Sequence, residues 1–209
     1  MKKNYVWDPL IRIFHWSLVV AFIVAYVTGD EEPLVHTNAG YVILGLLVVR
    51  IIWGFVGARH ARFSDFLYSP LKIATHLWAL LLNKKVQHYP GHNPAAAGMV
   101  FALLFSLIGT VYSGLEMEAL EGRGLLADTA SLQINKINVI SSAHADDRDD
   151  EDEGDYENET EDEDEFWEEV HELFANFTVF LVLLHIAGVL LSSYREKVNL
   201  IRAMFTGYK

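Results

Sequence analysis

Residues 171–185 read HELFANFTVFLVLLH, an apolar stretch with a histidine at each end. A helix rises about 1.5 Å and turns about 100° per residue, so the steps from His171 to His185 cover roughly 21 Å and nearly four turns. Both imidazole rings then lie on one face of the helix, near its opposite ends. The stretch predicts a membrane-spanning helix that presents one ionisable ring at each of two depths.

The rest of the chain divides into apolar and acidic parts. The 209 residues are 52% hydrophobic, yet the formal net charge is −12. Of the 28 acidic residues, 22 lie between Glu116 and Glu172. Cysteine is absent, which excludes disulfides, thiolate-ligated iron–sulfur clusters and haem attached through a C-x-x-C-H motif. Histidine is therefore the strongest candidate metal ligand in this sequence.

Four apolar runs approach the ~20 residues that a helix needs to cross a bilayer. We place these spans at about 10–29, 37–57, 95–115 and 173–191. The first run lacks a small-residue cleavage site, so we interpret it as an uncleaved membrane helix. The stretch at 70–85, PLKIATHLWALLLNKK, is amphipathic and favours a helix lying in the membrane interface. The predicted fold is an all-α, integral-membrane four-helix bundle, formed by a single domain over residues 1–209.

Positive residues predict the orientation in the membrane. They cluster before the first span, after the second and after the fourth, and four spans place these segments on one side. We expect that side to be the bacterial cytoplasm, which makes the chain a multi-pass inner-membrane protein with both termini cytoplasmic. The periplasmic side then receives the long acidic connection at about 116–172.

Within that connection, residues 146–165 read DDRDDEDEGDYENETEDEDE. This run has too few apolar side chains to bury, and we expect it to be disordered. Two roles are open for it. It is either a solvated spacer or an arm that attracts a basic periplasmic protein.

The orientation gives four histidines a depth. His15 and His185 lie in the cytoplasmic parts of the first and fourth spans, while His36 and His171 lie at the outer ends of the second and fourth. The four histidines form two pairs, each at one depth in the membrane. The pairs suggest two bis-imidazole sites, His15 with His185 and His36 with His171. Iron porphyrin suits such sites because it takes one imidazole on each face, whereas zinc usually takes three or four clustered protein ligands. Taken singly, each histidine also has an ordinary interpretation as an interfacial or packed residue.

Arg50 lies fourteen residues after His36, on the same face of the second span and nearer the cytoplasm. A guanidinium at that depth needs an anion or a route to the surface. We consider pairing with a propionate of the inner haem and snorkelling to lipid headgroups. The remaining histidines have no partner at matching depth, and we treat them as surface residues: His60, His76, His88, His92 and His144.

Five segments in order carry a resemblance to a known family. They are WDPLIRIFHW around His15, HTNAGY from His36, RIIWGFVGARHARFSDF from Arg50, GHNPAAAG at 91–98 and HELFANFTVFLVLLHIAGVL from His171. With these segments the chain resembles the bacterial di-haem cytochrome b superfamily, which includes cytochrome b-561 and the b-type subunits of nickel-iron hydrogenases.

The resemblance implies a four-helix membrane bundle with two non-covalent b haems, held by His15, His36, His171 and His185. It also implies electron transfer between the quinone pool and a periplasmic redox partner, such as a c-type cytochrome or a hydrogenase-like enzyme. The acidic run at 146–165 is a departure from that family pattern.

Three alternatives remain open. One is a redox enzyme of the same fold, such as a superoxide:quinone oxidoreductase. Another is a histidine-lined metal or proton transporter, although the spans contain almost no acidic residues. The third is a membrane anchor whose acidic loop holds a partner. The sequence thus leaves open whether the chain is an enzyme, for example one that oxidises quinol. The expected partners are lipid, a quinone and a redox protein, and no nucleic acid.

Overall fold

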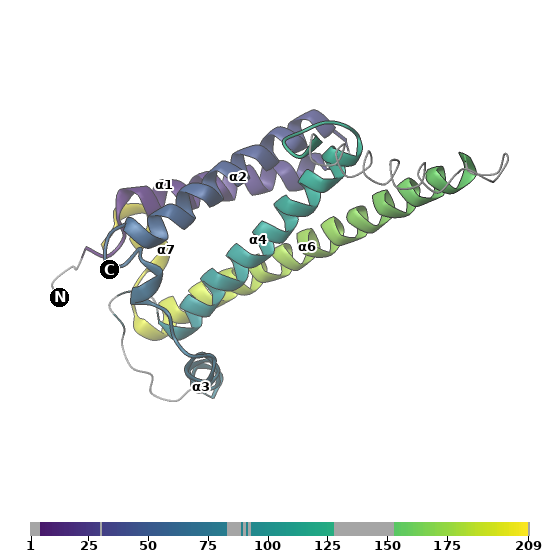
Figure 1. Cartoon of the computed structure of the whole chain (residues 1–209). Coiled ribbons are helices and arrows are strands. Elements are labelled where there is room, and N and C mark those ends of the chain that lie inside the picture. The colour runs from purple at the N-terminus through teal and green to yellow at the C-terminus, as the bar shows by residue number, and fades with distance from the viewer. Residues whose placement is uncertain are drawn as a thin grey trace. The chain divides into compact units, whose positions relative to one another are not determined.

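The computed structural model describes residues 5–29, 31–82, 89, 91, 93–127 and 153–208. They form α1 (Pro9–Thr28), α2 (Pro33–Val56), the 3₁₀ helix η1 (Phe63–Asp65), α3 (Pro70–Leu81), α4 (Pro94–Leu120), α6 (Glu153–Glu196) and α7 (Leu200–Thr206), as Figure 1 shows. These described residues contain no β-strand, only an isolated bridge between Tyr5 and Tyr208. The prediction of an all-α fold is confirmed.

Internal contacts divide the chain into two compact units. The first unit comprises Met1–Ile108 with Phe177–Lys209, and the second comprises Gly109–Asn176.

Prolines mark where four of the helices begin. The first residues of α1, α2, α3 and α4 are Pro9, Pro33, Pro70 and Pro94. At this position the fixed φ of proline suits the helix, and its missing N–H costs no helical hydrogen bond. Three of these helices are also capped by the residue before the proline. Asp8, Ser69 and Asn93 accept a hydrogen bond from the backbone N–H three residues later, at 3.0, 3.4 and 2.8 Å.

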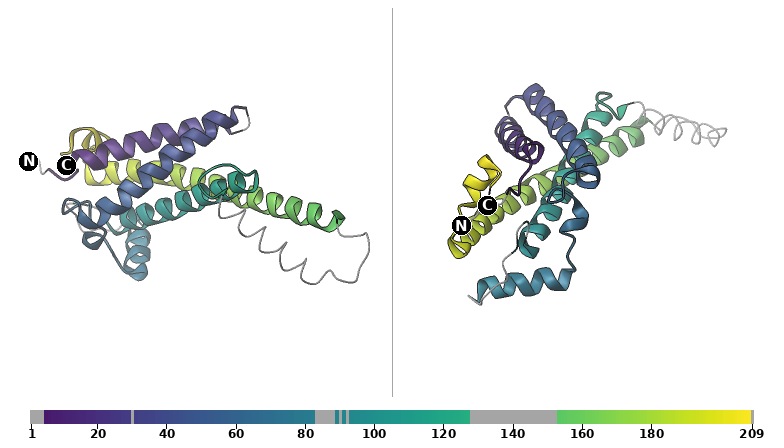
Figure 2. Two further views of the ribbon diagram at one scale, coloured as in Figure 1. Left: turned by 45° about the horizontal axis from the view of Figure 1, so that its top comes forward. Right: turned by 90° about the vertical axis from the view of Figure 1, so that its left-hand side faces the viewer.

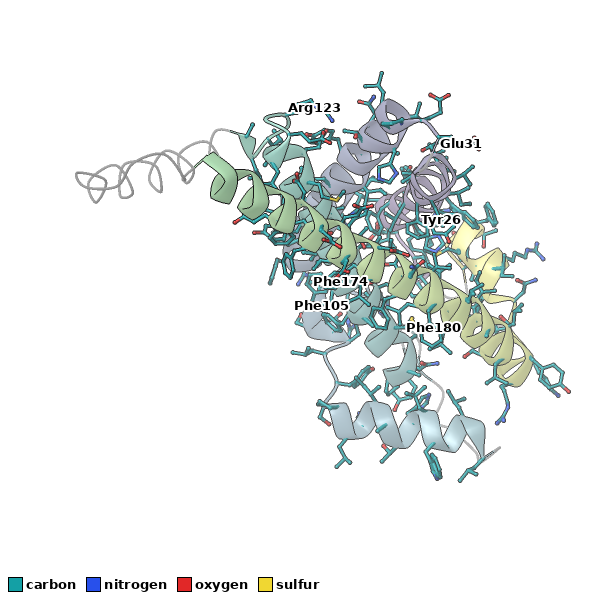
Figure 3. The ribbon with its side chains drawn as sticks, turned by 90° about the vertical axis from the view of Figure 1, so that its right-hand side faces the viewer. Tyr26, Glu31, Phe105, Arg123, Phe174 and Phe180 are labelled. Atoms are coloured by element: carbon teal, nitrogen blue, oxygen red, sulfur yellow. The ribbon has the colours of Figure 1, made fainter. Side chains whose placement is uncertain are left out.

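Four helical stretches are long and apolar enough to cross a membrane, and they overlap the four predicted spans. They are Pro9–Thr28, Pro33–Val56, Pro94–Leu120 and Glu163–Arg195 within α6. Their large apolar side chains are widely exposed: Tyr26 is 54%, Phe105 66% and Phe180 58% exposed, and Figure 3 labels all three. A water-soluble domain would bury most such side chains. These surfaces therefore suit lipid, as the predicted bundle requires.

The acidic connection differs from the prediction. Residues 153–165 are helical, because α6 begins at Glu153 and runs without a break to Glu196. The expected disorder over 146–165 is therefore wrong for 153–165, while 146–152 lie outside the described residues. Acidic side chains near a helix N-terminus are favoured by the helix dipole, and extending an existing helix avoids the unfavourable step of nucleation. The helix of the apolar span thus extends into the acidic residues that precede it.

Within the first unit, α1 and α2 pack along each other. The most deeply buried apolar residues of α2 are Ile43 and Leu47, which are 4% and 2% exposed. Ser106 of α4 and Thr178 of α6 form a fully buried hydroxyl pair with their oxygens 2.6 Å apart. These contacts hold the helices that carry the candidate ligands of this unit.

The amphipathic stretch after α2 forms α3, which confirms the predicted helix. Arg195, near the end of α6, donates from Nη2 to the backbone oxygen of Leu80 at 2.7 Å. This bond fastens the end of α6 to the end of α3. The location of α3 in the membrane interface stays a prediction.

The segment that leads into α1 lies beside the end of α7, as Figures 1 and 2 show. The backbone N–H groups of Val6 and Trp7 both donate to the oxygen of Gly207, at 2.9 and 3.2 Å. Gly207 ends α7 with a φ of 85°, in the left-handed region that favours glycine. A Cβ at this position would lie 2.9 Å from the oxygen of Trp7. Glycine therefore allows the C-terminus to approach the segment that leads into α1.

In the second unit, α4 ends in a Schellman motif. Gly122 has a φ of 71°, its N–H donates to the oxygen of Ala119 at 3.0 Å, and the N–H of Arg123 donates to the oxygen of Glu118 at 2.8 Å. These are the two bonds expected where a glycine in the left-handed region follows a helix. The motif stops α4 at a glycine that the sequence provides.

Candidate functional site

His15 of α1 and His185 of α6 lie close together in the first unit. Their ring centroids are 6.4 Å apart and the ring planes are inclined by 54°. An imidazole nitrogen that ligates a metal lies about 2 Å from the ion, so two imidazoles on one ion have ring centres roughly 6 Å apart once the rings themselves are counted. The observed spacing therefore suits a single ion held between the two rings.

The ring of His15 also has an unused polar atom. Its Nδ1 is buried and has no hydrogen-bond partner among the residues that the structure describes. Buried polar atoms in proteins are nearly always paired, so this atom points to a group that the described polypeptide does not supply. The ring packs edge-on against Trp16, with centroids 5.1 Å apart. Two neighbouring imidazoles beside an aromatic ring fit a porphyrin ligated through its iron.

His36, the first candidate ligand of α2, is oriented by the backbone of α1. Its Nδ1 lies 2.8 Å from the oxygen of Ala25. A carbonyl oxygen can only accept, so Nδ1 carries the proton and donates it. Nε2 of the neutral ring then carries no proton, as in an imidazole that binds a metal. The contact thus prepares His36 as a ligand through Nε2.

His171 is oriented by a serine within the second unit. Its Nδ1 lies 3.1 Å from Oγ of Ser113, a residue with no exposed surface. The same Oγ lies 2.9 Å from the oxygen of Gly109 and 3.0 Å from that of Thr110. Because those carbonyls only accept, the serine proton goes to one of them and Oγ is free to accept from Nδ1–H of His171. In this arrangement Nε2 of His171 again carries no proton, as in an imidazole that binds a metal.

The structure brings one of the two predicted pairs together. His15 and His185 share the first unit, and their ring spacing is the one expected of two ligands on one ion. His36 belongs to the first unit and His171 to the second, so their pairing stays a prediction. Within the described residues, no group of three or more His, Cys, Asp or Glu side chains could hold a bare metal ion. The transporter alternative therefore finds no clustered metal site there.

Arg50 is buried, with 4% of its surface exposed. Nη1 donates to the oxygen of Ala61 at 3.3 Å, and the guanidinium lies 4.7 Å from the ring centroid of Phe63. Asp8 lies near enough to interact with it electrostatically. Arg50 thus holds the segment after α2 against that helix, and its pairing with a haem propionate stays a prediction.

The other histidines behave differently from the prediction in one case. His76 is buried rather than at the surface, 9% exposed, and its ring lies edge-on to Tyr89 with centroids 5.7 Å apart. His60 lines a pocket of about 240 Å³ together with Tyr68 and Tyr89. Burial and the neighbouring Tyr89 raise the pKa of Tyr68 in this pocket. His88, His92 and His144 lie outside the described residues.

The sequence did not single out Ser113 as part of a site. Its only signal is a pair of small residues, Ser113 and Gly114, inside an apolar run. Gly114 also has a role beside the ring, because a Cβ there would lie 3.2 Å from Cε1 of His171. The small pair thus gives the imidazole both a hydrogen-bond acceptor and the space to lie against α4.

Comparison with known proteins gives one family and several relatives. The chain is 29% identical over 153 residues to the probable Ni/Fe-hydrogenase B-type cytochrome subunit of Azotobacter vinelandii, a match that covers 60% of this chain and 62% of the relative. It is 30% identical over 149 residues to the protein of that name from Azotobacter chroococcum mcd 1, covering 58% of this chain and 60% of the relative. For the probable Ni/Fe-hydrogenase 1 B-type cytochrome subunit of Escherichia coli (strain K12), the identity is 27% over 140 residues, with 54% and 59% covered.

The chain therefore spans about 60% of the length of these relatives. No solved structure matches the chain significantly. The family described as prokaryotic cytochrome b561 matches residues 6–207, nearly the whole sequence. This chain, with its four apolar helices, therefore belongs to the prokaryotic cytochrome b561 family.

Proposed function

We propose that this chain is a di-haem b cytochrome that carries electrons across the bacterial inner membrane, between a quinone and a periplasmic redox protein. The observation that carries the proposal is the 6.4 Å spacing of the His15 and His185 rings. Family membership implies b-type haem, and the two imidazoles come from helices that are apolar enough to span a membrane. One membrane domain over residues 1–209 would perform this function.

Four histidines would hold the haems. His15 and His185 would ligate the inner haem, while His36 and His171 would ligate the outer haem through Nε2. When bound, haem iron supplies a centre that changes reversibly between the ferrous and ferric states. The chain's contribution at the outer site is to fix the proton on Nδ1 of each ring, through the oxygens of Ala25 and Ser113. Rings fixed in this way present the same nitrogen in both oxidation states.

The redox partners follow from location and from the named relatives. Positive residues favour a cytoplasmic location for both termini, which puts the acidic N-terminal part of α6 in the periplasm. Glu163, Asp164 and Glu165 are exposed there. Relatives named as hydrogenase cytochrome subunits support a periplasmic hydrogenase-like enzyme as the partner, and a c-type cytochrome is the other candidate. A basic surface on either protein would be attracted by these acids, more weakly at high salt.

Haem content tests the proposal. The purified chain should show a reduced b-type spectrum with about two haems per chain, all extractable because none is covalently attached. His185→Ala should lose the inner haem and His171→Ala the outer haem, each leaving about half of the absorbance. Arg202→Gln, an exposed change on α7, is the control and should keep both haems. A folded chain without haem, or two histidine variants that lose the same haem, would contradict the proposal.

A further inference from the structure

Two buried N–H donors on one face of α1 have no acceptor. They are Nε of Arg12 and Nε1 of Trp16, and each is buried without a hydrogen-bond partner in the part of the chain that the structure describes. The residues are four apart on a helix, so their side chains are neighbours. They lie beside His15, which follows Arg12 by three positions and directly precedes Trp16.

The chemistry of these two atoms defines what is missing. Arginine and tryptophan side chains donate hydrogen bonds and do not accept them. Leaving such donors buried and unpaired is unfavourable, and more so for a charged group. The missing partner is therefore an acceptor, and the positive charge of Arg12 favours an anion. A carboxylate has two oxygens and can accept from both donors at once.

Both side chains are fixed in place by α7. Nη1 of Arg12 donates to the backbone oxygen of Phe205 at 2.6 Å. The ring of Trp16 stacks on the ring of Phe205, with centroids 4.4 Å apart and planes inclined by 22°. These contacts leave Arg12 Nε and Trp16 Nε1 in a defined position. A ligand can then bind there without reorganising the side chains, which favours binding.

The position lies directly beside the inner pair of histidines. Trp16 contacts the ring of His15 edge-on, and that ring lies 6.4 Å from His185. We propose that Arg12 and Trp16 form a carboxylate-binding cradle that takes a propionate of the haem held between His15 and His185. This inference rests on the proposed function, because it requires a haem at that pair.

Two other arginines of the first unit already donate to backbone oxygens. The guanidinium of Arg50 bonds to the backbone oxygen of Ala61 and covers the ring of Phe63, and that of Arg62 bonds through Nε to the oxygen of Gly57 at 2.7 Å. In Arg12, by contrast, the buried Nε has no acceptor among the described residues. The phosphate of a lipid headgroup is the other anion available near the cytoplasmic end of a membrane helix. The experiment must therefore separate a propionate from a phosphate.

A propionate is distinguished from a phosphate by comparing a porphyrin that has free carboxylates with one whose carboxylates are esterified. The full chain carrying His171→Ala, in which only the inner site should bind haem, is titrated with iron protoporphyrin IX and with its dimethyl ester. We expect the free acid to bind about tenfold or more tightly than the ester, as a charge-assisted hydrogen bond would give. When Arg12→Gln or Trp16→Phe is added to the His171→Ala chain, its affinities for the free acid and for the ester should become nearly equal. Trp16→Phe keeps an aromatic ring against Phe205, so it removes the donor with little effect on folding.

Arg202→Gln is the matched control, because it removes one positive charge from exposed α7. It should leave the preference for the free acid unchanged, and circular dichroism should show the same helicity in all variants. Equal binding of acid and ester by the parent chain would overturn the cradle, as would a preference that survives in both Arg12→Gln and Trp16→Phe.

The remaining outcomes separate the two proposals. If the ester binds as well as the acid but binding still requires His185, the haem site stands and the cradle falls. If neither porphyrin binds, the proposed function and the cradle both fall. A third outcome would identify a lipid phosphate as the acceptor. In that case Arg12→Gln and Trp16→Phe would bind less phosphatidylglycerol from vesicles than the parent chain does, while the ratio of the affinities for the free acid and the ester would not change. That result would overturn the propionate assignment.

Discussion

At His36 and His171 the chain itself decides which ring nitrogen carries the proton. A backbone oxygen does this for His36 and a serine hydroxyl for His171. Span positions alone allow these histidines to be predicted, because depth follows from where the apolar runs begin and end. Ser113 could not be predicted in the same way. Its contact with His171 depends on how two helices, 58 residues apart along the chain, are aligned.

Replacing Ser113 tests its effect on the proposed outer haem. Ser113→Ala removes the acceptor for Nδ1–H of His171, which makes the imidazole a weaker electron donor to iron. The ferric state is then less stabilised, and the midpoint potential of the outer haem should rise. One neutral hydrogen bond corresponds to about 1 kcal/mol, or roughly 40 mV for one electron. A spectroscopic redox titration measures the shift.

Ser106→Ala is the control for that measurement. Ser106 is also a fully buried serine of α4, but its partner is Thr178 rather than a candidate ligand. This variant should lower stability, because the hydrogen bond between the Ser106 and Thr178 hydroxyls is lost, and leave both potentials within a few millivolts of the parent. Equal shifts in the two variants would show that Ser113 acts only through packing.

At the scale of helices, starting points were easier to predict than lengths. Each of Pro9, Pro33, Pro70 and Pro94 begins a helix, and proline at a first helical position is a strong local signal. The start of α6 at Glu153 has no such signal, because the acidic residues before the span gain helical structure from the span that follows. Composition alone treats those residues as an isolated segment and so predicts disorder.

Asp8 is the cap whose loss should be most costly. One carboxylate oxygen accepts from Ile11 N, and the other accepts from Trp53 Nε1 at 3.2 Å, so the residue both begins α1 and links it to α2. Asp8→Ala should lower the free energy of unfolding by about 2 kcal/mol, from a lost cap and a lost hydrogen bond. Asp8→Asn keeps a cap oxygen and should lose about half as much. Thermal unfolding in detergent measures both.

Asp65→Ala provides the comparison for Asp8. Its carboxylate lies 4.0 Å from Nε of Arg59, whose side chain is 89% exposed. Such a surface ion pair contributes little, so this variant should unfold within about 0.5 kcal/mol of the parent. If Asp65→Ala lowered the free energy of unfolding as much as Asp8→Ala does, both carboxylates would stabilise the fold through their negative charge. The helix cap would then not explain the effect of Asp8.

For the molecule as a whole, the number of spans was predictable because span length is set by bilayer thickness. The contact between the chain ends was not predictable, since neither YVW at 5–7 nor GY at 207–208 is a recognisable pairing signal. Arg50 is a similar case. Its acceptor, Ala61, lies eleven residues away in a segment that turns back on the helix, and local sequence patterns do not predict such a reversal.

The absence of cysteine makes the orientation directly testable. Glu165→Cys, on the acidic part of α6, should react with a membrane-impermeant maleimide added to intact spheroplasts. Arg202→Cys, on α7, should react only after the membrane is permeabilised. Both positions are exposed, and the parent chain is an unreactive control. The opposite labelling pattern would place the acidic residues in the cytoplasm and exclude a periplasmic partner for them.

The joined chain ends also impose an order on biosynthesis. Val6, Trp7, Arg12 and Trp16 leave the ribosome well before Phe205 and Gly207, the residues that they contact. The helix α1 can enter the membrane early, but the contacts at its N-terminal end form only after α7 has been synthesised. The proposed inner haem would then be bound only by a chain that includes α7, and a truncated product ending before α7 would lack part of the site.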